Sequence, residues 1–332
     1  MKKFDVVTLG ELLIDMFPDK VGYKIGEVKA FIPKPGGAPA NVAVAVSRLG
    51  STSAFIGKLG QDHFGTYLKN VLDEENVTTT GIRFDPEART TMAIIAMPDE
   101  HTAEFVFYRN PGADQLLTEG DLDVEMLQST RVLHFCSVSL TDEPVRSATF
   151  AAARIARKAG ALVSYDVNYR PSLWKDPEEA LVQARLMLDE VDLVKVNEEE
   201  AALLTGVDEI DRTDPVEVER AALKLLDSGP QVVVITLGAE GSYFQTHQGG
   251  GYVPPFIVKT VDAVGCGDAF VAALLVKVIE GNDWRDNLSM GKLGEALKYA
   301  NAVGALTSLK RGAIPAMPTK EDVTKFMKKA AR

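Results

Sequence analysis

Short apolar runs rich in β-branched residues alternate along the chain with longer segments of helical period. Six such runs are predicted to be buried strands, and they cover residues 4–9, 53–56, 132–135, 162–165, 193–196 and 232–236. Segments with the length and pattern of helices lie between them, at residues 145–159, 177–189 and 215–227. Strands that are apolar on both faces are typical of a parallel sheet covered by helices. The pattern therefore predicts an α/β fold that binds its ligands beyond the carboxyl ends of the strands.

Two stretches, residues 20–34 and 89–108, depart from this rhythm because polar and apolar residues alternate in them. Such alternation indicates half-exposed antiparallel strands, and neither stretch is long enough to be a domain. We expect a small β lid, contributed by about residues 15–35 and 89–110, within one domain that spans residues 1–332. A lid of this kind could cover a site or pair with a second copy, so we expect a homodimer joined through it.

Composition and charge limit the possible partners and compartment. The chain has 332 residues, with 36 Lys plus Arg against 47 Asp plus Glu and a net charge of −11. This balance disfavours nucleic acid or an anionic membrane as the main partner, because both attract clustered basic residues. Cys136 and Cys266 form no CxxC pair, which suits a reducing compartment. Asp5 and Glu11 interrupt the first apolar run, and no apolar stretch reaches about 18 residues, so we expect a cytoplasmic protein.

The most informative segment is Val-Asp-Ala-Val-Gly-Cys-Gly-Asp at residues 261–268, which precedes a largely apolar helical pattern over 269–279. Glycines before a helix let backbone N–H groups converge, and the helix dipole adds positive potential, so phosphate suits this place. Asp268 lies in the first turn, where its carboxylate could take the proton of a hydroxyl that attacks a phosphoryl group. An ordinary acidic helix start is the alternative, and these residues alone do not separate the two interpretations.

A second glycine turn is Gly36-Gly37-Ala38-Pro39-Ala40-Asn41, which leads into a helical pattern over 42–49. The proline suits the first position of a helix, and Gly50 suits its end. Paired glycines allow a ligand to approach the backbone closely, and the amide of Asn41 can both donate and accept hydrogen bonds. A sugar hydroxyl would fit such a site, and a purely structural helix start is the alternative.

Together the two turns resemble the signatures of the ribokinase-like (PfkB-type) carbohydrate kinases, and they stand at the usual ends of the chain for that family. Segments 56–62 and 195–200 also match family blocks, so the resemblance covers nearly the whole sequence. Within the family, segments 36–43, 107–111 and 165–170 are similar to fructokinases. The resemblance implies a three-layer α/β/α fold with a mostly parallel central sheet and a small β lid. It also implies transfer of a phosphoryl group from ATP, with Mg²⁺, to a sugar hydroxyl, with fructose as the expected sugar.

Carried over to this chain, the resemblance makes Asp268 the base that is aligned on the accepting hydroxyl. The N–H groups of Gly265, Cys266 and Gly267 would form an anion hole for the transferring phosphoryl group. The usual family segment is Asp-Thr-x-Gly-Ala-Gly-Asp, whereas this chain has Ala263 for Thr and Cys266 for Ala. Main-chain donors form the anion site, so these changes should leave it working. A helix N-terminus should keep the pKa of Asp268 low, and it should lower that of the Cys266 thiol and make it sensitive to thiol reagents.

The resemblance also assigns a sugar pocket to both halves of the chain. The expected sugar contacts are Asp15, Gly36, Gly37, Asn41, Arg109, Asn168 and Arg170. The two arginines could bond to a neutral ketose or to a carboxylate, and segment 168–174 is also similar to 2-keto-3-deoxygluconate kinases. Pro39 in the first turn favours fructose. The alternatives are therefore a 2-keto-3-deoxygluconate kinase, another sugar or nucleoside kinase of the family, and a catalytically inactive sugar sensor.

The family's Asn-x-x-Glu motif matches Asn197 and Glu200, which would help to place Mg²⁺ and phosphates through water. The expected ATP contacts are Asn197, Glu200, Thr236, Gly238, Gly241 and Asn301. Many family members bind a monovalent cation beside the anion hole. Asp262 and the carbonyl of Val264 match one half of that site, and loop 307–312 could supply the rest. The resemblance therefore implies activation by K⁺.

Overall fold

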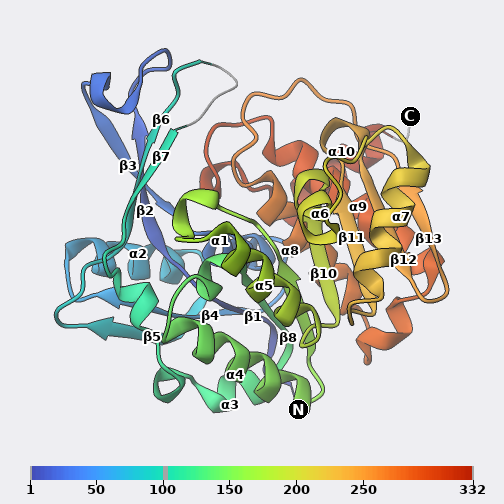
Figure 1. Ribbon diagram of the computed structural model, residues 1–332, viewed down its shortest axis with the longest axis horizontal. Helices are drawn as coiled ribbons and strands as arrows, with labels where there is room; N and C mark the ends of the chain where they lie inside the picture. Colours follow the sequence, from blue (N-terminus) through green and yellow to red (C-terminus); the bar gives the residue numbers. More distant parts are fainter. Residues whose placement is uncertain (1, 100–103, 331–332) are drawn as a thin grey trace.

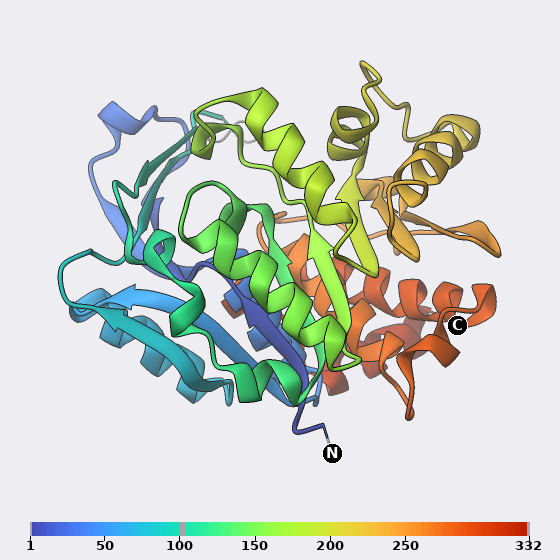
Figure 2. The same ribbon diagram turned by 60° about the horizontal axis from the view of Figure 1, so that its bottom comes forward.

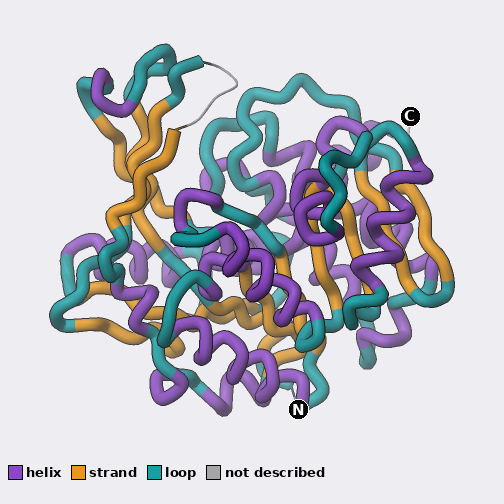
Figure 3. Tube along the Cα trace, viewed as in Figure 1, coloured by secondary structure: helices purple, strands orange, loops and turns teal. Residues whose placement is uncertain are grey.

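The computed structural model describes residues 2–99 and 104–330 of the chain. Figure 1 shows a broad α/β body from which a small sheet projects on one side, and Figure 3 shows the central strands enclosed by helices. The central sheet has nine strands in the order β13-β12-β11-β10-β9-β8-β1-β4-β5. In chain order they are β1 (Phe4–Leu9), β4 (Ser53–Gly60), β5 (Thr78–Asp85), β8 (Thr130–Cys136), β9 (Leu162–Asp166), β10 (Leu193–Asn197), β11 (Val232–Thr236), β12 (Ser242–Thr246) and β13 (Gly249–Val253).

Neighbouring strands from β11 to β5 are parallel, and β12 and β13 join the sheet in antiparallel pairs. All six predicted strands are present, and β1 and β11 have the predicted bounds. Three strands were not predicted: β5, β12 and β13. The last of these contains three glycines in a row and has no apolar run to reveal it. The prediction of a mostly parallel α/β sheet is confirmed.

Helices cover both faces of this sheet. One face holds α1 (Ala38–Arg48), α2 (His63–Glu74), α8 (Cys266–Val278), α9 (Met290–Thr307) and α10 (Lys320–Ala330). The other face holds α3 (Val124–Gln128), α4 (Val145–Lys158), α5 (Pro177–Leu188), α6 (Glu198–Thr205) and α7 (Pro215–Leu226). Figure 2 shows α4 and α5, drawn in green, across this second face. Successive residues of β1 point into opposite cores, since Val6 belongs to the first and Val7 to the second.

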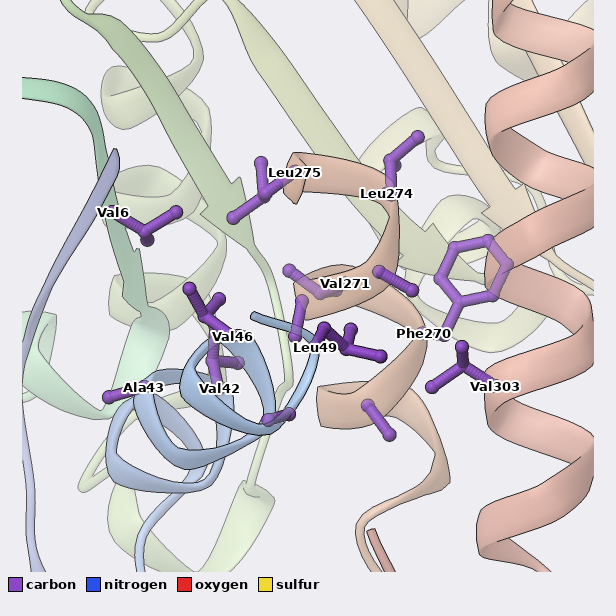
Figure 4. Packing of buried hydrophobic residues seen from close by; sticks show 14 of the residues in the cluster. Val6, Val42, Ala43, Val46, Leu49, Phe270, Val271, Leu274, Leu275 and Val303 are labelled. Carbon is purple, nitrogen blue, oxygen red and sulfur yellow. The ribbon is translucent and has the colours of Figure 1, made fainter. Parts of the chain in front are cut away.

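The first core joins the two helices that begin with the glycine turns. In Figure 4, Val42 and Val46 of α1 face Val271 and Leu275 of α8, and Val303 of α9 packs against Phe270. Nine of the 13 residues of α8 are buried, because the helix lies between the sheet, α1 and α9. Each fully buried Val or Leu contributes about 1.5–3 kcal/mol. This packing fixes the first turns of α1 and α8 side by side, although they are far apart in the sequence.

The small projecting sheet has the strand order β3-β2-β6-β7. Its strands are β2 (Leu13–Pro18), β3 (Phe31–Gly36), β6 (Met92–Ala96) and β7 (Glu104–Tyr108). The predicted lid therefore exists, but β2 and β6 pair in parallel, so the expectation of purely antiparallel strands was wrong. Stretch 20–34 is strand only from Phe31 onward, because β2 begins earlier, at Leu13. Residues 100–103 of the predicted stretch 89–108 lie outside the described residues.

Candidate active site

The glycine turn before α8 forms a helix N-terminus at the carboxyl end of the sheet. Gly265 is the N-cap and has φ +77°, and a Cβ built on it would lie 2.8 Å from Ala313. Both the left-handed backbone and the close approach therefore require glycine here. The N–H of Cys266 already donates to the carbonyl of Ala263 at 3.2 Å. Of the three expected anion donors, Gly265 and Gly267 have no such turn bond among the described contacts.

Asp268 is the third residue of α8, and its carboxylate is almost fully buried. The Nδ2 group of Asn41, in the first turn of α1, donates to its Oδ2 at 2.8 Å. The pKa of Asp268 is raised to about 6, because burial raises it by more than the hydrogen bond from Asn41 lowers it. The expectation of a low pKa was therefore wrong, because the loss of solvation outweighs the helix dipole. A carboxylate with this pKa is a better proton acceptor than a solvated one.

Beside Asp268 lies a cavity of about 350 Å³, and most of the expected sugar contacts meet in its wall. They are Asp15, Gly37, Asn41, Asn168 and Arg170. Gly36 supports this wall, since a Cβ on it would lie 2.0 Å from Oδ2 of Asp15. Burial, together with the negative charge of Asp268, raises the pKa of Asp15 to about 7. Side chains from the lid, including Phe105 and Phe107, close the cavity on one side.

Arg109 has a different environment from the expected one. It is absent from the wall of this cavity among the described residues, and its side chain is only 4% exposed. Its Nε donates to Asp114 at 2.7 Å, and its terminal nitrogens donate to Thr141 and to the carbonyl of Val138. The guanidinium therefore ties the end of β7 to the body of the protein. The fold buries this arginine because a carboxylate and two further oxygens satisfy it there.

Glu11, which was not predicted to belong to the site, also lines the cavity beside Asp268, called the sugar-side cavity below. Its Oε1 accepts the N–H of Ala38 at 2.9 Å, whereas its Oε2 has no partner. Burial raises the pKa of Glu11 to about 7. The available signal was its position: Glu11 is an acidic residue two positions after the end of a buried strand in an α/β fold. This carboxyl group holds the N-terminus of α1, and with it the turn that carries Gly37.

A second cavity of about 530 Å³ lies on the other side of the α8 N-terminus. Five expected nucleotide contacts line it: Asn197, Thr236, Gly238, Gly241 and Asn301. Gly241 has φ +100°, and a Cβ there would lie 2.4 Å from the carbonyl of Val253. The amide of Asn301 donates to the carbonyls of Val253 and Pro254, which holds the loop after β13. Apolar side chains of that loop and of α8, such as Phe256, Ile257 and Phe270, offer a surface suited to the flat ring of a nucleotide base.

Asn197 and Glu200 form a reciprocal cap at the start of α6. The Oδ1 of Asn197 accepts the N–H of Glu200 at 2.7 Å, and Oε2 of Glu200 accepts the N–H of Asn197 at 2.9 Å. The other oxygen, Oε1, accepts the N–H of Tyr169 at 2.8 Å. Asn197 lines both cavities, and Glu200 lines the sugar-side one. Both Glu200 oxygens therefore already accept a backbone hydrogen bond.

The described residues contain no group of three or more His, Cys, Asp or Glu side chains that could hold a metal ion. Asp262 accepts the N–H groups of Val264 at 3.0 Å and Gly312 at 2.8 Å, so its carboxylate joins the two loops expected to form the cation site. The carbonyl of Ser308 accepts the N–H of Val261 and thereby closes the same junction. Carboxylate and carbonyl oxygens are the donors that hard cations prefer.

Cys266 differs from its predicted behaviour. Burial and the neighbouring charges of Asp262 and Asp268 raise the pKa of its thiol to about 12. The Sγ atom lies 3.7 Å from the carbonyl oxygen of Asp262, to which it donates. The expected lowering of the thiol pKa by the helix N-terminus is therefore outweighed, and that prediction was wrong.

Four residues belong to the walls of both cavities: Lys195, Asn197, Ala263 and Gly267. Lys195 was not among the predicted site residues, because it lies inside an apolar strand pattern. Its Nζ pairs with Asp166, which was not among the predicted site residues either. Two cavities that meet at a helix N-terminus, with a buried carboxylate beside it, suit a phosphotransferase that acts between two bound small molecules.

Comparisons with known proteins agree with this class. The model of the pfkB family of carbohydrate kinases matches residues 3–320. The chain is 44% identical to fructokinase-1 of Oryza sativa subsp. japonica over 98% of each chain. The structure of the Xylella fastidiosa fructokinase with bound ATP superposes with a TM-score of 0.88 at 32% identity, covering 98% of this chain and 99% of that one. The fructokinase of Vibrio cholerae O395, in a form with fructose, ADP and calcium bound, gives 0.84 at 33% identity, with coverage of 97% and 99%.

The chain belongs to the pfkB family of carbohydrate kinases. The family and the ribokinase-like fold expected from the sequence are thereby confirmed, as is the expectation of an enzyme that phosphorylates a sugar hydroxyl. No helix in the described part of the chain is long and apolar enough to cross a membrane.

Proposed function

We propose that this protein is a fructokinase, which converts D-fructose and ATP into D-fructose 6-phosphate and ADP. The observation that carries the proposal is the buried carboxylate of Asp268 in the sugar-side cavity, next to the turn that borders the second cavity. The similarity to plant and bacterial fructokinases over 97% or more of the chain supports fructose as the sugar. ATP is the proposed phosphoryl donor, in agreement with the nucleotides bound in the related structures.

In the proposed mechanism, Asp15, Asn168, Arg170 and the Gly36–Gly37 turn bind the sugar and orient its hydroxyl group toward Asp268. The hydrogen bond from Asn41 holds the Asp268 carboxylate in one orientation. Phosphoryl transfer depends mainly on in-line positioning and neutralisation of charge. The N–H groups at the start of α8 would stabilise the transferring group, and Asp268 would receive the hydroxyl proton late in the step.

Mg²⁺ would enter as the counter-ion of the ATP phosphates. Asn197 and Glu200, whose oxygens each accept a backbone N–H group, would contact it through water. Asp262 and the carbonyl of Val264 would hold a monovalent cation, which would neutralise charge beside the α8 N-terminus. Equal rates in sodium, potassium and choline buffers would refute the proposed activation by K⁺.

We also propose a cytoplasmic homodimer joined through the lid. Large apolar side chains are exposed on its strands, with Ile32 50%, Phe105 43%, Val106 45% and Tyr108 62% exposed. Such a surface is typical of an interface. Sedimentation should give a dimer at micromolar concentration, and a monomer would contradict the proposal.

The first experiment measures sugar-dependent ADP release with MgATP and K⁺, using fructose, glucose, ribose, 2-keto-3-deoxygluconate and an aminoimidazole riboside, with Asp268→Ala as the control. Release with fructose alone, lost in the variant, is the expected result. Arg170 lines the sugar-side cavity and could pair with a carboxylate, so preferred release with 2-keto-3-deoxygluconate would reassign the substrate. Sugar binding without ADP release would instead indicate a sensor.

A further inference from the structure

Lys195 is a buried lysine in the wall that the two cavities share. It lies in β10, where the parallel register sets it beside Asp166 of β9. Its Nζ is 3.1 and 3.3 Å from the two carboxylate oxygens of Asp166. The two side chains are 9% and 2% exposed. The strand register therefore fixes an ammonium group at the junction between the cavities.

Stability alone gives little reason for this ion pair. The cost of removing two charges from water roughly cancels their attraction, and apolar residues of similar volume often serve as well. The position of the ammonium indicates a different reason. A Cβ built on Gly267 would lie 3.7 Å from the Nζ of Lys195, and no other non-neighbouring atom lies within 4 Å of it. The ammonium and the first turn of α8 therefore face the same open space.

The charges around that space also require a cation. The sugar-side wall carries five acidic side chains, which are Glu11, Asp15, Asp166, Glu200 and Asp268. The basic side chains of the same wall are Arg170, which is exposed, and Lys195, which is buried. In the wall of the larger cavity, Lys195 is the one basic side chain among the described residues. Burial lowers the pKa of Lys195, but Asp166 and Glu200 raise it more, so it stands above its usual value and the group stays charged.

We propose that Lys195 is a catalytic residue, whose Nζ donates hydrogen bonds to the phosphoryl group during transfer, and that Asp166 is its positioning residue. This inference rests on the proposed function. In the step, a bond forms between the sugar hydroxyl oxygen and the terminal phosphorus of ATP, while the bond from that phosphorus to the bridging oxygen breaks. The electron pair leaves with ADP, and the hydroxyl proton goes to Asp268. Lys195 keeps its protons and stabilises the negative charge on the oxygens of the phosphoryl group during its transfer.

The first test compares Lys195→Met with a matched control, Lys58→Met. Lys58 is also a poorly exposed lysine in a strand, and it pairs with Asp121 at 3.1 Å outside both cavities. We expect Lys195→Met to lower kcat at least 100-fold with the KM for fructose changed less than threefold. The control should keep kcat within threefold. If wild type phosphorylates fructose and Lys195→Met keeps more than a third of its kcat, the catalytic role is wrong. If wild type phosphorylates no sugar, the proposed function itself fails.

A double variant separates a structural role from a catalytic one. Lys195→Met leaves Asp166 as an unpaired buried charge, which destabilises the fold. Adding Asp166→Asn removes that charge, so thermal stability should recover while kcat stays at least 100-fold low. Recovery of kcat together with stability would show that the lysine serves only the fold.

A binding measurement tests the same contact without turnover. Aluminium fluoride bound with ADP imitates the phosphoryl group in the transition state of transfer. The affinity of the enzyme for ADP with aluminium fluoride, in the presence of fructose, can be measured by calorimetry. We expect Lys195→Met to weaken this complex at least 30-fold while it changes the affinity for ADP alone less than threefold. Equal affinity of wild type and variant for the fluoride complex would overturn the proposal.

Discussion

The amide of Asn41 donates a hydrogen bond of 2.8 Å to the carboxylate of Asp268, although 227 residues separate them along the chain. The bond exists because α1 and α8 pack through the same apolar core, as Figure 4 shows. It joins the glycine turn expected to bind the sugar to the one expected to bind the phosphoryl group. The residue expected to bind the sugar and the residue expected to accept its proton are thereby fixed relative to each other.

Asp268→Asn and Asp268→Ala should lower kcat by about a thousandfold, because a positioned general base contributes about 10²–10⁴-fold. The KM for fructose should change less than threefold. Steady-state ADP release measures both constants. Asp214→Asn is the matched control, since Asp214 also stands at a helix start but lies at α7, outside both cavities. Near-normal turnover in either Asp268 variant would remove this residue from the mechanism.

The pH dependence of kcat/KM should show an acidic limb centred near pH 6. Asp268 must be ionised to accept the hydroxyl proton, and burial raises its pKa to about 6. Below that pH the protonated fraction grows and the rate should fall about tenfold per unit. The limb should persist in Asp15→Asn and in Glu11→Gln, each of which removes another carboxyl group of the cavity wall whose pKa is raised to about 7. A flat profile between pH 5 and 8 would contradict this assignment.

Gly36→Ala should raise the KM for fructose at least tenfold, because the new Cβ would lie 2.0 Å from Oδ2 of Asp15 and displace that carboxylate. Gly26→Ala is the control, since nothing lies within 4 Å of a Cβ at that lid position. Initial rates over a range of fructose concentrations give the two KM values. The same KM in both variants would show that the Gly36 turn does not position a sugar contact.

Glu11→Gln should stabilise the protein at pH 8 but not at pH 5. The folded-state pKa of Glu11 is raised to about 7, so the native state binds more protons than the unfolded state between about pH 4.5 and 7. Wild-type stability therefore falls as pH rises through that window. Gln can accept the N–H of Ala38 without this charge, which corresponds to a gain of the order of 3 kcal/mol above pH 7.

Thermal unfolding at both pH values measures the Glu11→Gln effect. Glu178→Gln is a suitable control because Glu178 is exposed at the start of α5. A gain that is equal at pH 5 and pH 8 would show that the charge of Glu11 is not its cause.

Local sequence patterns predicted much of the backbone. Helices α4, α5 and α7 begin at the predicted residues and end one residue early. Both glycine turns precede helices as expected, because the steric freedom of glycine and the start of an apolar period are visible in the residues themselves. The missed strands β12 and β13 are held by antiparallel pairing to neighbours, and their own residues give a weak signal.

Roles that depend on partners were predicted less well. Arg109 was expected in the sugar pocket, and a buried pairing with Asp114 holds it elsewhere. Lys195 was passed over because it interrupts an apolar strand, and only the register between β9 and β10 brings Asp166 to it.

The sequence by itself determined where the chain forms strands, helices and glycine turns, and which family these turns indicate. Only the tertiary structure decided the pKa values of the buried carboxyl groups Glu11, Asp15 and Asp268 and of the Cys266 thiol. A helix N-terminus predicts a low pKa for Asp268, yet burial raises it to about 6. The physical reason is that backbone conformation depends on neighbours in the sequence, whereas the solvation and field at a buried group depend on elements that meet only in the folded protein.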